Sequence, residues 1–378
     1  MLKQLTAQLL SRTPLDGGQV ALAVAELVDE KIAPETKADF LGALARKGET
    51  PEEIAAFARE LRERALPVPL DTETRSREIL DVVGTGGDRL GTFNISTTVA
   101  IVCAAAGVTV AKHGNRAVTS QCGSTDVLEA LGVRIDLSPE QAAQSLREHG
   151  FAFFFAQKFH PAFKHVGPAR KLCAERGQRT IFNFLGPLLN PARPTAQLVG
   201  VPQPALCEPL ARVLQSLGVR RGMVVCGGIA NCQSPIANLK DPASQQTQVA
   251  GLPAIGNWKL EIGNLDELST LGDNTIAEFY QERGFATSVL SPENFPLQPA
   301  ALDDLRGGDG AANAEIVRRI LRGEERGPKR DVVLLNTAAA LFVAGKARSL
   351  SDGWDMAAGV IDSGQANAKL AELCSRSF

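Results

Sequence analysis

The hydrophobic pattern changes near residue 79, and this change restricts the possible folds more than any other feature of the sequence. Before it, through about residue 65, apolar residues recur at the spacing of amphipathic helices, as at Val20, Val24 and Leu27. Three or four short helices are expected there. One should begin at Thr50, because threonine is a good N-cap and Pro51 suits a first helical turn. Residues 67–69, Pro-Val-Pro, cannot continue a helix and are expected to form a connection.

Beyond residue 79, short apolar and β-branched runs alternate with helical segments. This alternation favours an α/β sheet with helices packed on its faces. The expected strands cover residues 79–83, 108–111, 151–155, 197–201, 223–226 and 332–335.

One stretch, residues 227–265, differs from its surroundings. It is rich in Gly, Asn, Gln, Ser and Pro and contains few charged residues. Long segments of this kind are uncommon inside compact domains, so an inserted excursion is expected here.

Composition excludes several classes of protein. The chain has 378 residues, of which 44% are hydrophobic, enough for a sizeable core divided between two domains. The net charge of −2 lacks the basic excess typical of nucleic-acid binders. The seven cysteines show no zinc-ligand spacing and are interpreted as reduced cytosolic thiols. The sequence shows neither a signal peptide nor an apolar run long enough to cross a membrane, so a cytoplasmic location is expected.

A glycine-rich loop follows the first expected strand. Residues 84–88 read Gly-Thr-Gly-Gly-Asp, and a helix is expected to begin around Asn94. A strand, a glycine loop and a helix in this order direct backbone amides toward an anion. The loop is neither a Walker loop nor a dinucleotide-binding fingerprint, because Arg89 stands where the latter requires its last glycine. A phosphate site and a plain glycine turn are both compatible with spacing alone.

Polar and charged residues also follow the second expected strand, where Lys112, His113 and Asn115 stand close together. Ligands of open α/β sheets bind at the carboxyl ends of strands, although a solvated strand end is the simpler interpretation. A second loop of small residues, Gly123 and Ser124, precedes the next expected helix. Two such loops beside one basic strand end favour a ligand site.

Together these motifs resemble the anthranilate phosphoribosyltransferase family, which has the nucleoside phosphorylase and phosphoribosyltransferase fold. The resemblance covers nearly the whole chain except residues 227–265. It rests on residues 84–88, 94–97 and 112–116, on His160-Pro161, and on 180–187, 265–269 and 336–341, with 47–50 also similar.

The resemblance implies an α/β fold in which a small N-terminal helical domain, with a returning helical segment, packs on a larger α/β domain with a central mixed, largely parallel sheet. Residues 1–70 and about 163–192 would form the helical domain. Residues 71–162 and 193–378 would form the phosphoribosyl-pyrophosphate-binding domain, with 227–265 inserted. A homodimer through the helical domain is expected, with no nucleic-acid or membrane partner.

The resemblance also implies substrates and site residues. The activity would transfer the phosphoribosyl group of phosphoribosyl pyrophosphate to the amine of anthranilate, in tryptophan biosynthesis. Two Mg²⁺ ions are expected with bound phosphoribosyl pyrophosphate, held by Ser96, Asp266 and Glu267. Residues expected to bind phosphoribosyl pyrophosphate are Gly84, Gly86, Gly87, Asp88, Thr92, Asn94, Ser96, Thr97, Lys112 and Ser124. Those expected to bind anthranilate are Gly84, His113, Asn115, Arg170 and Pro187. No residue is assigned as a catalytic acid or base, because the aromatic amine is already neutral.

Three departures from the family pattern concern acceptor specificity more than reaction type. The chain is about three residues longer between Arg170 and Arg179, Cys122 replaces a more usual serine, and residues 227–265 are additional. Two alternatives remain open at this stage. One is a related phosphoribosyltransferase or nucleoside phosphorylase with another acceptor, and the other is a non-catalytic paralogue that binds nucleic acid.

Overall fold

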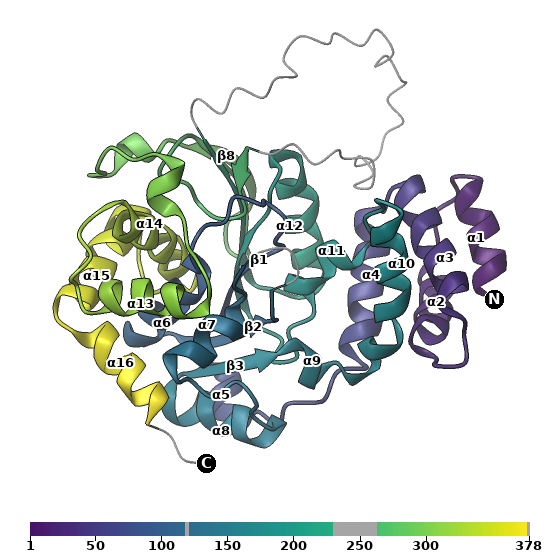
Figure 1. The fold of residues 1–378 in the computed structure, drawn as a ribbon, viewed down its shortest axis with the longest axis horizontal. Coiled ribbons are helices and arrows are strands. Elements are labelled where there is room, and N and C mark those ends of the chain that lie inside the picture. The colour runs from purple at the N-terminus through teal and green to yellow at the C-terminus, as the bar shows by residue number, and fades with distance from the viewer. Residues whose placement is uncertain (118–120, 230–262, 376–378) are drawn as a thin grey trace, which may run out of the picture.

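The computed structural model describes residues 1–117, 121–229 and 263–375. A helical bundle lies at one end of the molecule, beside a larger part built around a twisted sheet (Figure 1). The bundle contains α1 (Leu2–Leu10), α2 (Gly17–Val28), α3 (Pro34–Lys47) and α4 (Pro51–Arg62), and α10 (Gly167–Glu175) returns from later in the chain to pack on α3. The start of α4 confirms the predicted cap, because Thr50 Oγ1 accepts a hydrogen bond from Glu53 N at 3.2 Å.

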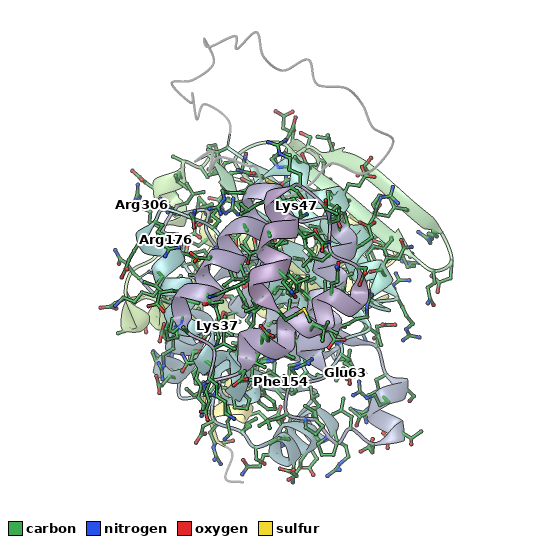
Figure 2. The ribbon with its side chains drawn as sticks, turned by 90° about the vertical axis from the view of Figure 1, so that its right-hand side faces the viewer. Lys37, Lys47, Glu63, Phe154, Arg176 and Arg306 are labelled. Atoms are coloured by element: carbon green, nitrogen blue, oxygen red, sulfur yellow. The ribbon has the colours of Figure 1, made fainter. Side chains whose placement is uncertain are left out.

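Buried polar contacts join the returning segment to the bundle. The ammonium of Lys37, whose residue is almost fully buried, donates to the carbonyl of Asp29 at 2.7 Å and to that of His165 at 2.8 Å. Cys173 Sγ donates to the carbonyl of Ala38, and Arg176 pairs with Asp39 at 2.9 Å. Figure 2 views the bundle from its outer side, with Lys37 and Arg176 labelled. These contacts fix α10 against α3.

Among the described residues, the sheet has eight strands, in the order β3-β2-β1-β4-β5-β7-β8, with β6 paired to β5. The first five are parallel to one another, whereas β6, β7 and β8 are antiparallel to their neighbours. The sheet is therefore mixed and largely parallel, as predicted. The strands are β1 (Ile79–Gly84), β2 (Thr109–Gly114), β3 (Phe151–Phe155), β4 (Ala196–Gly200), β5 (Arg221–Gly228), β6 (Asn264–Leu265), β7 (Asn274–Tyr280) and β8 (Gly284–Leu290).

Helices cover both faces of the sheet because successive strand residues point to opposite sides. On one face, Leu80, Val82 and Leu198 pack with α6 (Ile95–Ala105), α7 (Ser124–Leu131), α13 (Gly310–Leu321), α14 (Pro328–Val343), α15 (Leu350–Asp362) and α16 (Gln365–Cys374). On the other, Val199 and Val224 join α12 (Cys207–Ser216) and the helical bundle in one continuous core. A smaller core beneath β2 and β3 includes α8 (Pro139–His149) and α9 (Ala156–Phe159).

The remaining short helices connect these elements. They are α5 (Thr72–Ser76), α11 (Phe182–Leu185) and the 3₁₀ turns η1 (Pro161–His165), η2 (Gly186–Leu188), η3 (Pro204–Leu206), η5 (Pro292–Asn294) and η6 (Leu302–Leu305). Among them, the segment from η1 to η2 runs between the bundle and the sheet. Within the described part of the chain, no helix is both long and apolar enough to cross a membrane.

Two expectations about the elements need correction. Residues 332–335, predicted as a strand, belong to α14. This helix is buried on nearly all sides, so a short apolar run within it resembles a buried strand in sequence. The excursion expected to span 227–265 is shorter than predicted. Gly227 and Gly228 belong to β5, and Asn264–Leu265 form β6. Most of that excursion, residues 230–262, lies outside the described residues.

Candidate active site

The candidate site is organised by the turn that carries Asp266 and Glu267. This turn crosses the carboxyl ends of β1 and β4, where Gly84 and Gly200 are paired in register. A Cβ atom on Gly200 would lie 1.6 Å from the carbonyl oxygen of Asp266, and one on Gly84 would lie 2.3 Å from Asp266 Oδ2. Only glycine permits an approach this close, so the two strand ends bring the acidic pair over the sheet.

Both acids contact the first predicted phosphate loop or the helix that follows it. Gly86 N donates to Asp266 Oδ2 at 2.7 Å, and Ser96 N at the start of α6 donates to Glu267 Oε1 at 3.2 Å. Gly86 and Gly87 have φ values of 73° and 93°, in the left-handed region that favours glycine. The structure therefore brings together residues that are about 180 positions apart in the chain.

The pKa values of Asp266 and Glu267 are both raised above those of exposed carboxylates. The pKa of Glu267 is raised to about 7, mainly by burial; Lys112 opposes this shift and the nearby Asp88 contributes to it. Burial also raises the pKa of Asp266, and the negative charges of Asp88 and Glu267 reinforce that shift. Both residues nevertheless retain some solvent-accessible surface. Acids placed this close together destabilise one another unless a cation is bound between them.

Lys112 supplies the positive charge beneath this cluster. The residue is fully buried, and its ammonium donates to the carbonyl of Val82 at 2.7 Å and lies 3.4 Å from Ser96 Oγ. Burial lowers its pKa, whereas the negative charges of Asp81 and Glu267 oppose that shift. An ammonium has three donors, and the hydrogen bonds to Val82 and Ser96 use two of them, so Lys112 retains donor capacity for an anionic ligand.

The loop between β1 and α6 is held by a distant segment. Thr92 forms an isolated antiparallel bridge with Arg306, and Phe93 N donates to Leu305 O at 3.1 Å. Asn94 donates through Nδ2 to the carbonyl of Cys122 at 3.2 Å and accepts from Asn313 Nδ2 at 2.9 Å. The side chain of Asn94 therefore joins both phosphate loops to α13.

Two further predicted phosphate residues occupy helix starts. Thr97 in the first turn of α6 is fully buried, and its Oγ1 has no hydrogen-bond partner among the described residues. Ser124 begins α7, the second helix that opens at this edge of the sheet. Helix N-termini here come from two separate loops and provide partial positive charge.

Among the predicted acceptor residues, His113 contacts the returning segment, which also contains Arg170 and Pro187. His113 Nδ1 lies 3.1 Å from the carbonyl of Gly186, next to Pro187 in the returning segment. Asn115 is exposed just beyond β2. Arg170 on α10 is exposed, and its guanidinium lies 5.2 Å from the centre of the Phe182 ring.

His160, which had no predicted role, packs beside His113. Its ring meets that of His113 edge-on at 5.4 Å and stacks on Phe163 at 4.9 Å. Phe163 in turn contacts Phe182 edge-on at 5.6 Å, beneath Arg170. In the sequence, this wall was indicated by the motifs that contain His113, His160 and Phe182, whereas Phe163 lies in none of them.

Both histidines are neutral at physiological pH. Burial lowers the pKa of His113 to about 3, helped by the proximity of His160, and burial lowers the pKa of His160 to about 4. They therefore present neutral, flat surfaces and weak hydrogen-bonding groups rather than positive charge. This property suits contact with an aromatic ring.

Two family models match separate parts of the chain. A model of the glycosyl transferase family, helical bundle domain, matches residues 3–65, and one of the glycosyl transferase family, a/b domain, matches residues 76–240 and 260–367. An anthranilate phosphoribosyltransferase of Geobacter sulfurreducens is 42% identical over 99% of this chain and 98% of its own length. This chain belongs to the anthranilate phosphoribosyltransferase family.

Solved structures of the family have the same fold. The crystal structure of anthranilate phosphoribosyltransferase from Thermus thermophilus matches with a TM-score of 0.80 and 39% identity, covering 98% of each chain. The enzyme from Saccharomyces cerevisiae in complex with PRPP and Mg matches with a TM-score of 0.77 and 25% identity, covering 99% of this chain and 96% of that one. Membership in the family confirms the predicted fold class.

The neutral histidines generate a pH prediction. A histidine has a pKa near 6.5 in the unfolded chain, so below that pH the unfolded state binds protons that folded His160 does not bind. Stability should therefore fall as the pH decreases from about 6.5 toward the folded pKa of about 4. Between pH 7 and pH 5, the free energy of unfolding, measured with urea, should therefore decrease by roughly 2 kcal/mol less in His160→Phe than in the wild-type chain. An unchanged pH dependence in the variant would contradict the assignment, and His165→Phe at the partly exposed neighbouring histidine is the control.

Proposed function

We propose that this chain transfers the phosphoribosyl group of phosphoribosyl pyrophosphate to the amine of anthranilate, giving N-(5-phosphoribosyl)anthranilate and pyrophosphate in tryptophan biosynthesis. Relatives that share its full length are anthranilate phosphoribosyltransferases. The observation that carries the proposal is the acidic turn across Gly84 and Gly200, beside buried Lys112 and the start of α6. This arrangement combines groups that bind an anionic leaving group with groups that bind a cation.

Magnesium fits the donors that the chain offers. Asp266 and Glu267 are oxygen donors whose raised pKa values reflect burial and mutual repulsion, which a divalent cation would relieve. Among the described residues, no group of three or more His, Cys, Asp or Glu side chains is arranged to bind a metal by itself. Magnesium characteristically uses one or two carboxylates and completes its shell with water and substrate phosphates. Ser96 would supply a further oxygen, and two ions would accompany phosphoribosyl pyrophosphate.

The leaving group determines most of the chemistry. Breaking the bond from ribose C1 to pyrophosphate develops negative charge on pyrophosphate, and preorganised donors lower the energy of that charge. Bound magnesium would contribute by neutralising part of the charge. We assign this end of the substrate to the loop glycines Gly84, Gly86 and Gly87, to Lys112 and to the starts of α6 and α7. Asp88, Thr92, Asn94, Ser96, Thr97 and Ser124 are the other proposed contacts of phosphoribosyl pyrophosphate.

The acceptor side needs position rather than a base. The amine of anthranilate is neutral at pH 7, so bringing it close to C1 is the main requirement. Gly84, His113, Asn115 and Pro187 would surround it, and Arg170 would pair with its carboxylate in the planar manner that guanidinium groups favour. The lowered pKa of His113 agrees with a positioning role, because no proton needs to be accepted there.

The proposed domain division follows from these elements. We infer a helical domain of residues 1–70 with about 163–192, an α/β domain of 71–162 and 193–378, and an insertion within 227–265. The family model leaves residues 241–259 unmatched, inside that insertion. A cytoplasmic location is likewise inferred, from the biosynthetic role proposed here.

The direct test of function follows anthranilate fluorescence after addition of phosphoribosyl pyrophosphate. Fluorescence should fall with magnesium and stay constant after chelation. A nucleoside phosphorylase would instead release a base from a nucleoside with inorganic phosphate, so the same assay with those substrates separates the alternatives. Gel shifts at physiological salt test the nucleic-acid-binding alternative.

Removing either acid should weaken the site strongly. Asp266→Asn and Glu267→Gln are each expected to lower turnover about a hundredfold, because one charge-stabilising contact is often worth roughly 3 kcal/mol. The magnesium concentration for half-maximal activity should also rise. A wild-type magnesium titration in both variants would refute the assignment, and Asp273→Asn, outside the turn, serves as the control.

Arg170 is predicted to act on the acceptor alone. Arg170→Ala should raise the KM for anthranilate far more than the KM for phosphoribosyl pyrophosphate, because only the acceptor carboxylate loses its partner. Lys171→Ala, an exposed neighbour on α10, should leave both constants unchanged. Equal increases in both constants for Arg170→Ala would indicate a general disturbance of α10 instead.

We also infer a homodimer formed through the helical domain. Three of the four large apolar side chains that are strongly exposed among the described residues, Met1, Leu10 and Leu22, lie on or beside α1 and α2. Sedimentation velocity should show a species of twice the chain mass, and Leu10→Glu with Leu22→Glu should shift it toward the monomer. A monomeric wild-type protein at micromolar concentration would contradict this inference.

A further inference from the structure

The residues immediately after the acidic pair are held by two buried asparagine side chains. Asn336 on α14 accepts a hydrogen bond from Leu268 N at 2.9 Å and donates through Nδ2 to the carbonyl of Leu268 at 2.8 Å. Its Nδ2 also donates to the carbonyl of Val332, one turn earlier in the same helix, at 2.9 Å. Both main-chain polar groups of Leu268 are therefore bound by one side chain.

Asn274, at the start of β7, repeats this arrangement on the next residue. It accepts from Ser269 N at 2.6 Å and donates to the carbonyl of Ser269 at 3.0 Å. Further contacts from its Nδ2 to the carbonyls of Gly272 and Leu290, each at 3.2 Å, fix the side chain itself. Asn336, Asn274, Leu268 and Ser269 are all fully buried.

The two amides replace the partner strand that the turn lacks. A carboxamide presents one donor and one acceptor side by side, as a peptide group does, and so can bind both main-chain groups of one residue. On the other side of the turn, close approach fixes the backbone. A Cβ atom on Gly227 would lie 2.4 Å from the carbonyl of Glu267, and Gly200 approaches the carbonyl of Asp266. Residues 266–269 are thus held from both sides.

The fixed turn determines where the two acidic side chains point. Asp266 Oδ2 accepts from Gly86 N and Glu267 Oε1 accepts from Ser96 N, so the carboxylates are directed at the glycine loop and at the start of α6. Without a fixed backbone, the acidic residues would move apart or toward solvent, and their geometry would have to be rebuilt when a ligand binds. The asparagines hydrogen-bond to the backbone of the residues that follow the acids. They can therefore influence a ligand bound by the carboxylates only by fixing the conformation of the turn.

We propose that Asn336 and Asn274 are positioning residues that hold Asp266 and Glu267 in the conformation that receives magnesium and pyrophosphate oxygen atoms. The proposal rests on the function proposed above. It assigns a role to the polar residue that begins the apolar motif 336–341, and it makes α14 a support of the site rather than only a core helix. Partners that orient metal ligands in this way typically change metal affinity by about tenfold to a hundredfold when they are lost.

Calorimetric binding of phosphoribosyl pyrophosphate, with and without magnesium and in the absence of anthranilate, tests the proposal without turnover. In the wild-type chain magnesium should increase the affinity. In Asn336→Ala and in Asn274→Ala this increase should shrink about tenfold or more. Leu335→Ala, a buried apolar truncation on α14, leaves both asparagines in place, so it should lower the unfolding midpoint and leave the magnesium-dependent increase intact.

The possible results distinguish failure of the positioning role from failure of the proposed function. A full magnesium-dependent increase in folded Asn336→Ala and Asn274→Ala, with loss of stability alone, would overturn the positioning role. Should Asn336→Ala fail to fold, Asn336→Asp keeps the size of the side chain and the acceptor for Leu268 N, and the same comparison applies to it. A wild-type chain whose affinity does not depend on magnesium would overturn the proposed function itself, and this inference with it.

Discussion

Close approach between the acidic turn and the glycine ends of two parallel strands is the contact on which the site depends. Parallel strands place their carboxyl ends at one edge, but side chains there would normally keep a crossing segment several ångströms away. Gly84 and Gly200 remove that barrier, and Asp266 lies directly against them. The same contact brings Asp266 to the amide of Gly86, so the shape of the phosphate loop and the position of the acid are determined together.

Near this contact, buried polar side chains connect the returning segment to the sheet. Asp81 accepts from Asn190 Nδ2 at 2.9 Å and from His113 N at 3.2 Å, which joins β1, β2 and the returning segment. Burial raises the pKa of Asp81 to about 6, while Lys112 and Asn190 oppose that shift. Fully satisfied polar contacts of this kind restrict the core to one arrangement, because any other would leave a buried group unpaired.

Sequence reasoning predicted much of the local structure. Thr50 caps α4, α6 begins just after Asn94, and β3 has the expected limits, because these features depend on residues that are adjacent in the chain. It was wrong at 332–335, and it missed β7 and β8. In β8 most side chains are exposed, so its residues show no apolar run, and the strand is formed mainly by backbone pairing to β7. Pairing with a distant strand leaves little signal in a single sequence.

The sequence by itself determined the order of glycine loops, strands and helix starts, and it contained the motifs by which the family is recognised. These properties follow from local backbone preferences and hydrophobic periodicity. Only the tertiary structure decided which distant residues meet: Asp266 with Gly84, Asn94 with Asn313, and His113 with Gly186. It also decided that the pKa values of His113 and His160 are lowered and that the pKa of Glu267 is raised. Those properties arise from burial and from charges brought close by folding, and residue type and spacing do not encode them.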